Sequence, residues 1–248
     1  MKAPRRRRLD ERVVEAGLAE SRAKAQAFIR TGRVLVDDVP VEKPGTPVAA
    51  DASLRLRGES PRFVSRGGEK LAGALEALGV DPRRLACLDV GASTGGFTDC
   101  LLQAGARAVV AVDVGYGQLH PRLRNDPRVV VRERTHAARL AAELLPEPID
   151  LVTIDVSFIS LEKILPRLVE VAPGAPLLAL VKPQFEVGRE QVGKGGVVRD
   201  DALRREAVDR VAARAEALGY REQGRVESCL AGPKGNREVF LWLVRAVE

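Results

Sequence analysis

Two lysines and two carboxylates stand where a folded sheet could bring them together. Lys182 ends the apolar run LLALV and is followed by Pro183, so a buried strand delivers an ammonium group to its last position. Asp155 ends the apolar run IDLVTI in the same way. Ligands of open α/β sheets lie beyond the carboxyl ends of the parallel strands, so both side chains are expected at one edge. Glu238, near the start of REVFLWLV, joins them if that strand runs antiparallel, and Lys70 could close the group from the preceding helix.

Such a group suits the removal of a proton from an alcohol. A ribose 2′-hydroxyl is a poor nucleophile until its proton is taken, and a neutral amine within hydrogen-bond reach can take it. Burial and a neighbouring ammonium lower the pKa of a lysine, whereas carboxylates raise it and fix the direction of the amine. We predict that Lys182 is the base, that Lys70 tunes and positions it, and that Asp155 and Glu238 orient the lysines. Taken singly, Lys70 and Glu238 could equally be solvent-facing residues.

A glycine-rich turn, LDVGASTGGFTDC, ends a strand and opens a helix, whose free N–H groups attract an anionic group. Its spacing, D-x-G-x-x-x-G-x-F, differs from the G-x-G-x-x-G that holds a pyrophosphate. Asp113 ends the next strand, where a carboxylate can accept from two ribose hydroxyls. S-adenosylmethionine fits these features better than a dinucleotide or a turn that serves only close packing. The predicted cofactor-binding residues are Asp89, Gly91, Ala92, Ser93, Thr94, Gly95, Gly96, Phe97, Asp113, Val114 and Asp155.

Alternating strand and helix patterns must position these residues. Strands are expected at 85–90, 106–113, 128–131, 149–155, 176–182, 224–230 and 237–244, and helices at 69–79, 95–105, 159–171 and 200–219. Strands this apolar are buried on both faces, which is typical of a parallel sheet covered by helices. The predicted fold class is therefore α/β, an open, doubly wound, Rossmann-like sheet ended by an antiparallel hairpin joined at GPKGN.

The beginning of the chain has a different character. Short helical patterns at 9–17 and 21–30 precede short strand patterns at 33–38, 39–42 and 53–58, separated by Gly, Pro and Asp turns. We predict a small α+β domain over 1–57, a linker over 58–65 and the α/β domain over 66–248.

Composition and charge favour a soluble protein that meets a polyanion. The 248 residues are 45% hydrophobic and carry a net charge of +6, concentrated in the starting run KAPRRRR. This favours nucleic acid over membrane, although a solvated basic surface would have the same charge. Cys87, Cys100 and Cys229 are too widely spaced for a zinc site or a disulfide framework, and no metal is predicted. Neither a signal peptide nor an apolar span is recognisable, so a cytoplasmic location is expected.

Basic residues in three places are expected to contact RNA, although any one of them could be solvated surface instead. They lie in the basic start, in the second helical pattern, and around the catalytic edge. The long glycine-rich segment 185–200 is expected to order over a target nucleotide after its base leaves the helix. The predicted RNA-binding residues are Arg5, Arg6, Arg7, Arg8, Arg22, Lys24, Arg30, Arg33, Arg66, Arg189 and Lys194.

Long motifs throughout the chain resemble one enzyme family. They are SRGGEKL, CLDVGASTGGFTDCLLQAGA, VDVGYGQL, DVSFISL, LVKPQFEVG, GKGGVVRD and GPKGNREVF. They look like the TlyA family of ribosomal RNA methyltransferases, whose catalytic domain resembles the FtsJ-type 2′-O-methyltransferases. The resemblance implies an S-adenosylmethionine-dependent methyltransferase sheet preceded by an S4-like RNA-binding domain. It also implies a tetrad at Lys70, Asp155, Lys182 and Glu238, and 2′-O-methylation of cytidine in the rRNA of the small or large ribosomal subunit, or both.

One departure from the family pattern and two other hypotheses remain. His136, in ERTHAARL, stands where similar proteins usually carry Asn, which puts a contact to the adenine in question. A non-catalytic RNA-binding ribosome-assembly factor is disfavoured because all four tetrad residues are present. A cytolysin, suggested by the haemolysin label of some family members, is disfavoured by the lack of a recognisable export signal or span. The cytidine that is modified and the oligomeric state do not follow from the sequence.

Overall fold

The computed structural model describes residues 6–50, 52–58, 62–193, 195–232 and 235–246, with the side chain of residue 189 also left out. The chain forms two compact units, Met1–Arg62 and Phe63–Glu248. Their boundary falls inside the segment expected as a linker. Phe63, within this segment, is buried in the core of the second unit, so its aromatic side chain anchors the segment there.

The first unit is a small α+β domain. Leu9, Val13, Ala25 and Ile29 of its two helices are buried together with Val34. Strands β3, β2 and β5 form an antiparallel sheet, and β1 pairs antiparallel with β4. Its elements are β1 (Arg6–Arg8), α1 (Leu9–Glu15), α2 (Arg22–Arg30), β2 (Val34–Val36), β3 (Val39–Pro40), β4 (Pro47–Ala49) and β5 (Leu54–Leu56). The β1–β4 pair was not expected, because a run of arginines has no apolar alternation.

Asp10 ties three parts of the first unit together. Its buried carboxylate accepts hydrogen bonds from Arg8 Nε (3.0 Å), Arg22 Nε (2.9 Å) and Gln26 Nε2 (2.8 Å). The hydrogen bonds from Arg8, joined by those from Gln26 and Arg22, hold the pKa of Asp10 well below its usual range. Arg8 and Arg22 therefore have a structural partner in addition to any ligand.

The second unit is the predicted α/β domain. Its elements are α3 (Arg66–Leu78), β6 (Ala86–Val90), α4 (Gly96–Gln103), β7 (Ala108–Val112), α5 (Pro121–Arg124), β8 (Val129–Arg132), η1 (Ala137–Arg139), η2 (Ala142–Leu144), β9 (Leu151–Ile154), α6 (Leu161–Val171), β10 (Leu177–Val181), α7 (Pro183–Glu186), η3 (Arg189–Gln191), α8 (Asp201–Glu216), β11 (Tyr220–Glu227) and β12 (Val239–Arg245). Gly79 ends α3 in the left-handed conformation, as its position after the apolar stripe predicts.

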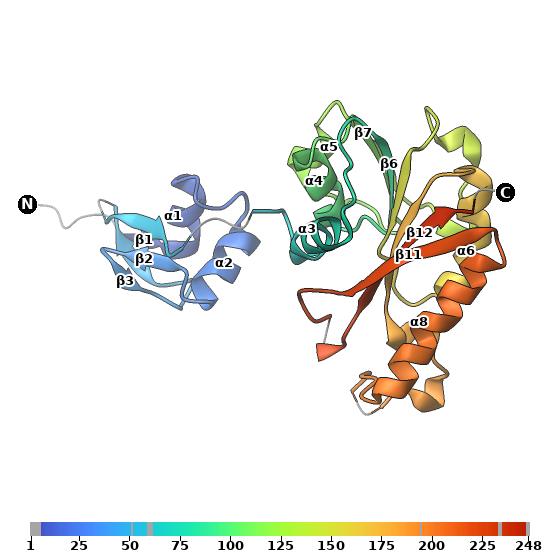
Figure 1. Ribbon diagram of the computed structural model, residues 1–248. Helices are drawn as coiled ribbons and strands as arrows, with labels where there is room; N and C mark the ends of the chain where they lie inside the picture. Colours follow the sequence, from blue (N-terminus) through green and yellow to red (C-terminus); the bar gives the residue numbers. More distant parts are fainter. Residues whose placement is uncertain (1–5, 51, 59–61, 194, 233–234, 247–248) are drawn as a thin grey trace, which may run out of the picture. The chain divides into compact units, whose positions relative to one another are not determined.

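The central sheet has seven strands in the order β11-β12-β10-β9-β6-β7-β8 (Figure 1). Strands β10, β9, β6, β7 and β8 are parallel, and β12 pairs antiparallel with both β10 and β11. The predicted doubly wound sheet with a terminal antiparallel hairpin is confirmed. Strand β11 begins at Tyr220, earlier than expected, because its alternating burial leaves many polar residues in the strand.

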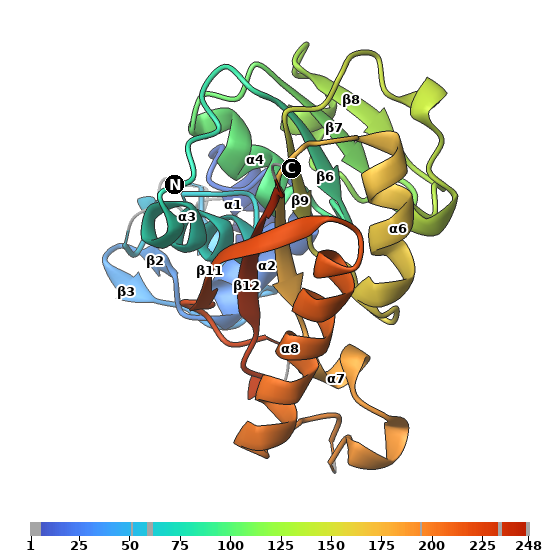
Figure 2. The same ribbon diagram turned by 45° about the vertical axis from the view of Figure 1, so that its right-hand side comes forward.

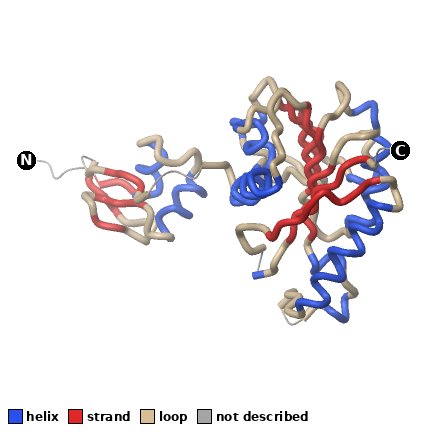
Figure 3. Tube along the Cα trace, viewed as in Figure 1, coloured by secondary structure: helices blue, strands red, loops and turns tan. Residues whose placement is uncertain are grey.

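Helices cover both faces of this sheet (Figures 2 and 3). Along β10, Leu177, Ala179 and Val181 pack in the same core as α6 and α8. Leu178 and Leu180 instead pack in the core that α3, α4 and α5 cover. The near-continuous apolar runs of the parallel strands are thus explained by burial on two sides.

The hydrogen bonds that Asp10 accepts lead us to expect that a substitution at this residue destabilises the first unit. Asp10→Asn removes the charge that accepts hydrogen bonds from three side chains, those of Arg8, Arg22 and Gln26, and should destabilise the unit by about 1–3 kcal/mol. Hydrogen exchange of the amides at 6–50 in the full chain would measure this loss. Asp38→Asn is the matched control, since Asp38 pairs with Arg55 on the surface and such pairs contribute little. Equal exchange in both variants would refute a structural role for Asp10.

Candidate active site

A cavity of about 460 Å³ lies at the carboxyl edge of the sheet. We call it the tetrad cavity, because its lining includes all four residues of the predicted tetrad, Lys70, Asp155, Lys182 and Glu238. They come from α3, from the ends of β9 and β10, and from the residue before β12. Lys70 lies in the second turn of its helix, not the first as expected, because α3 begins at Arg66.

The tetrad forms two lysine–carboxylate pairs. Lys70 Nζ lies 2.5 Å from Glu238 Oε2, and Lys182 Nζ lies 2.5 Å from Asp155 Oδ1. The Glu238 side chain is 0% exposed and both lysine side chains are 11% exposed. When its lysine is protonated, each pair is electrically neutral, which offsets the cost of holding these charges largely away from water.

Strand direction brings Glu238 to this edge. In the antiparallel β10–β12 pair, Val181 lies opposite Val239, so the residues next to them, Lys182 and Glu238, are placed at the same end. Gly232 lies directly above the carboxylate, and a Cβ there would overlap Glu238 Oε1. The turn is closed by the Gly232 amide, which donates to the carbonyl of Asn236 (2.8 Å).

Ser157 is a further polar residue of the site, and it was not predicted. Lys182 Nζ donates to Ser157 Oγ at 3.0 Å, and Ser157 lines the tetrad cavity. The available signal was its place in DVSFISL, two residues beyond Asp155. A lone serine after a strand is too common to carry such a prediction.

A second cavity of about 560 Å³ shares Gly91, Ser93, Asp155 and Ser157 with the first. We call it the Asp113 cavity. Asp113 Oδ2 accepts from the Ser93 amide (2.8 Å), and Oδ1 accepts from the Gly115 amide (2.6 Å). Each carboxylate oxygen keeps a further lone pair, so the side chain is oriented and can still accept from two hydroxyls.

The glycines of the turn allow a close approach of backbone segments. Gly91 has φ +90°, and a Cβ there would overlap the carbonyl oxygen of Asp155. Gly96 opens α4 where a Cβ would overlap Ser65 Oγ. The β6–α4 turn is therefore packed directly against the loop that carries Asp155.

The predicted cofactor residues divide into two groups. Among the described residues that line the two cavities, Asp89 and Gly95 are missing. Asp89 is fully buried, and Gly95 faces the apolar core, where a Cβ would meet Leu119 and Leu123. Asp89 Oδ2 accepts from Thr98 Oγ1 at 2.6 Å, and burial raises the pKa of Asp89 to about 7. The residues that do line the cavities are Gly91, Ala92, Ser93, Thr94, Gly96, Phe97, Asp113, Val114 and Asp155.

His136 lines the Asp113 cavity. Its Nδ1 accepts from the Ala138 amide at 3.1 Å and caps η1. An asparagine side chain can make the same kind of cap, which gives a structural reason why either residue suits this position.

The segment 185–200 is folded over much of its length, unlike the open loop that was expected. It begins within α7 and contains η3 and a bridge between Gly193 and Val197. Asn236 accepts from the Val198 amide (3.1 Å) and donates to the carbonyl of Gly196 (2.8 Å). The segment is thus attached to the residues that precede Glu238.

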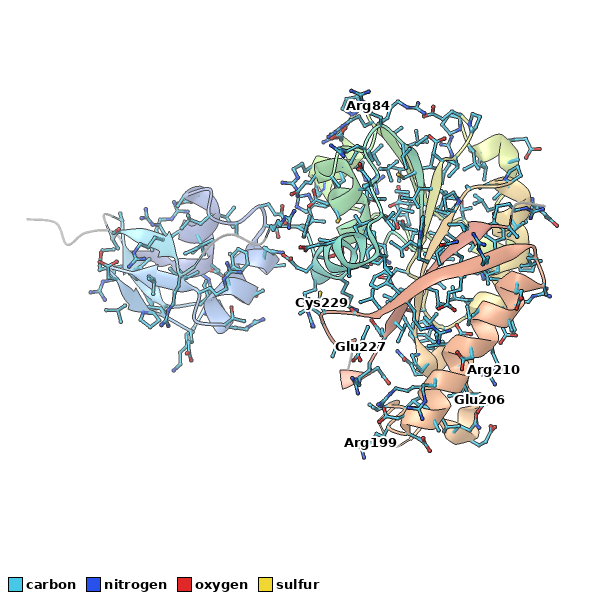
Figure 4. The ribbon with its side chains drawn as sticks, viewed as in Figure 1. Arg84, Arg199, Glu206, Arg210, Glu227 and Cys229 are labelled. Carbon is cyan, nitrogen blue, oxygen red and sulfur yellow. The ribbon has the colours of Figure 1, made fainter. Side chains whose placement is uncertain are left out.

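Glu186 anchors the start of the same segment. Its carboxylate accepts from Ser160 Oγ (2.6 Å) and from the Leu161 amide (3.0 Å) at the start of α6, and burial raises its pKa. Arg210 of α8, labelled in Figure 4, donates to the Glu186 carbonyl. These side-chain hydrogen bonds, and not helix or strand pairing, hold the segment in place, so no periodic sequence pattern indicates its fold.

The predicted RNA-binding residues are distributed over both units. In the first, Lys24 Nζ and Arg33 lie 5.6 and 4.8 Å from the Phe28 ring centroid, and Arg30 donates to Gln26 (3.4 Å). In the second, Arg66 donates to the Ala231 carbonyl (3.2 Å) at the tetrad cavity. The remaining positions are Arg6, Arg7 and Arg8 in β1, Arg22 in α2 and Arg189 in η3, while Arg5 and Lys194 lie outside the described residues.

Within the described part of the chain, no three His, Cys, Asp or Glu side chains are grouped so that they could hold a metal ion. Of the helices formed by these residues, none has the length and apolar character needed to cross a membrane.

Known proteins share this architecture. Residues 63–245 match the family described as FtsJ-like methyltransferase, and residues 7–53 match the S4 domain. The 16S/23S rRNA (cytidine-2′-O)-methyltransferase TlyA of Mycobacterium tuberculosis is 53% identical over 96% of this chain and 90% of its own. The chain belongs to the TlyA family. The family resemblance that the motifs indicated is confirmed.

Two further relatives also match this chain over most of its length. The 23S rRNA (cytidine-2′-O)-methyltransferase TlyA of Campylobacter jejuni is 37% identical over 77% of this chain and 75% of its own. A solved structure from Streptococcus thermophilus that carries a hemolysin name is 39% identical, with a TM-score of 0.76, over 98% of this chain and 90% of its own. The similarity to the S. thermophilus structure therefore extends over both units.

The buried Asp89 carboxyl predicts a pH dependence of stability. An unfolded Asp89 loses its proton near its ordinary pKa of 3.8, whereas the folded chain keeps it to about pH 7. Stability should therefore fall as pH rises from about 4 to 7, by about 1.4 kcal/mol for each pH unit of difference. Denaturant unfolding of the wild type and Asp89→Asn should show the variant gaining relative stability across this window.

Asp126→Asn is the control for this measurement. Hydrogen bonds from Arg128 lower the pKa of Asp126, so its contribution is constant between pH 5 and 7. A difference between wild type and Asp89→Asn that stays constant over pH 4–7 would contradict a raised pKa.

Proposed function

We propose that this chain transfers a methyl group from S-adenosylmethionine to the 2′-oxygen of a cytidine ribose in ribosomal RNA, in the cytoplasm. The observation that carries the proposal is the meeting of two lysine–carboxylate pairs in a cavity that adjoins the Asp113 cavity. The names of the relatives from M. tuberculosis and C. jejuni support the substrate.

The Asp113 cavity has the donors and acceptors that S-adenosylmethionine needs. The spare lone pairs of Asp113 suit the ribose hydroxyls, and Val114, Ala137 and His136 offer surfaces to the base. Ser93, Thr94 and Gly96 at the start of α4 suit the carboxylate of the methionine part. When bound, S-adenosylmethionine supplies a methyl carbon made electrophilic by the sulfonium.

The tetrad would prepare the accepting oxygen. Lys182 takes the 2′-hydroxyl proton at Nζ, with Asp155 holding the amine in place. Lys70, held by Glu238 in the same cavity, places a second positive charge beside the developing alkoxide. Both carboxylates act by orienting a lysine.

The first unit would supply RNA affinity through phosphate contacts from exposed arginine and lysine side chains. The S4 match and the basic residues of β1 and α2 support this assignment. Arg5, outside the described residues, is proposed to contribute with the basic residues of β1, while Arg66, Arg189 and Lys194, the last also outside the described residues, are proposed to meet the RNA nearer the target. We propose ribosomal subunits as the natural partners, with segment 185–200 over the target nucleotide.

The deciding experiment supplies methyl-labelled S-adenosylmethionine and unmodified small and large subunits separately. Label should appear at a cytidine 2′-oxygen, and Lys182→Ala should lower its rate of formation about 100- to 10,000-fold because the base is lost. Lys163→Ala, an exposed lysine of α6, is the control and should keep the wild-type rate. RNA binding without any label on either subunit would favour the assembly-factor hypothesis.

Gly91 offers a test of the cofactor position. Gly91→Ala should weaken S-adenosylmethionine binding at least about tenfold, since the new Cβ must push Asp155 away from the shared wall of both cavities. Gly174→Ala is the control, because Gly174 has φ +81° with open space at its Cβ. Both variants place a non-glycine residue at positive φ, but only Gly91→Ala also creates the overlap with Asp155. Calorimetric titration should therefore give a weaker affinity for S-adenosylmethionine in Gly91→Ala than in Gly174→Ala. Equal affinities would contradict the proposed position of the cofactor.

A further inference from the structure

We propose that Ser157 is a positioning residue, whose hydroxyl fixes the direction of the Lys182 amine so that its lone pair faces the substrate hydroxyl. This inference rests on the proposed function. It adds a residue to the reaction that lies outside the four-residue tetrad.

The contacts of Lys182 lead to this role. Its Nζ lies 2.5 Å from Asp155 Oδ1 and 3.0 Å from Ser157 Oγ. Both partners follow β9, separated only by Val156, so they approach the amine from one loop. Among the described residues, Lys70 Nζ has a single charged or hydrogen-bonding partner, Glu238. Lys182 is thus the lysine with two polar contacts, an ion pair with Asp155 and a hydrogen bond to Ser157.

The two partners together determine the direction of the lone pair on the Lys182 amine. A neutral amine has two N–H bonds and one lone pair. In the proposed scheme one N–H turns to Asp155, with which the amine forms an ion pair, and the other is donated to Ser157, so the lone pair is left in the remaining tetrahedral direction. With Asp155 alone, the amine can rotate about Cε–Nζ, and the lone pair would sample several directions. Ser157 lines both cavities, so its contact with Lys182 lies at the wall that the two cavities share.

The reaction then balances without another reactant. The 2′-O–H bond breaks as an N–H bond forms at Lys182 Nζ, and the oxygen electron pair forms the bond to the methyl carbon. The carbon–sulfur electron pair stays with sulfur, which becomes a neutral thioether. Ser157 exchanges no proton in this scheme, because it acts only through the orientation of Lys182.

The test compares Ser157→Ala, Ser157→Cys and Ser157→Thr in the full chain with labelled S-adenosylmethionine and the ribosomal subunit that the wild type modifies. Loss of orientation should lower kcat about 10- to 100-fold in the alanine variant. The cysteine variant should behave alike, since it keeps the side-chain volume with a weak acceptor. The KM for the subunit, the Kd for S-adenosylmethionine and the Tm should stay near wild type. The threonine variant, which keeps the hydroxyl, should recover most of kcat.

Ser53→Ala serves as the matched control. Ser53 is an exposed serine of the first unit, so its loss should leave both kcat and Tm near wild type. Wild-type kcat in Ser157→Ala, or a threonine variant as slow as the alanine one, would overturn the role of Ser157. Wild-type protein that transfers no label to either subunit would instead overturn the proposed function itself.

Discussion

The neutral set formed by Lys70, Glu238, Lys182 and Asp155 constrains the structure around it. A buried ion that loses its partner costs about 3–5 kcal/mol, so neither pair can be opened without weakening the fold. Ion-pair contacts at 2.5 Å then require that α3, β9, β10 and the start of β12 meet closely. The glycines above and beside the set, Gly232 and Gly91, follow from this requirement, because no side chain fits there.

The sequence predicted the parts of the site that are attached to regular strands. An apolar run reports a buried strand, and the polar residue that ends it must lie at the edge where ligands bind. Asp155, Lys182 and Asp113 were placed correctly for this reason. Glu238 depended on the direction of the last strand, which the hairpin pattern indicated. Which lysine pairs with which carboxylate could not be predicted, because side-chain reach across the sheet edge leaves no trace in residue spacing.

The sequence did not predict the parts of the structure that are held in place by contacts between single side chains far apart in the chain. Glu186 bonds to the start of α6, and Asn236 bonds to segment 185–200, so an apparently open loop is folded. The contact between Ser157 and Lys182 is of the same kind. Asp89 shows the converse case, since its place in the motif suggested a ligand contact and burial gives it a structural one. The periodicity of a sequence indicates positions that are buried at regular intervals. Contacts made by single side chains recur at no regular interval, so they leave no such pattern.

Strand β12 follows every other strand in the chain, yet it lies between β10 and β11 in the sheet. The sheet must therefore leave room between these neighbours, or admit β12 together with β11 as a hairpin, before the Lys70–Glu238 pair can form. That pair joins residues 168 positions apart, a contact of the kind that makes folding slow. Completion of the active site therefore requires β12 in its place, and a chain in which β12 is not yet paired has Lys70 without its carboxylate.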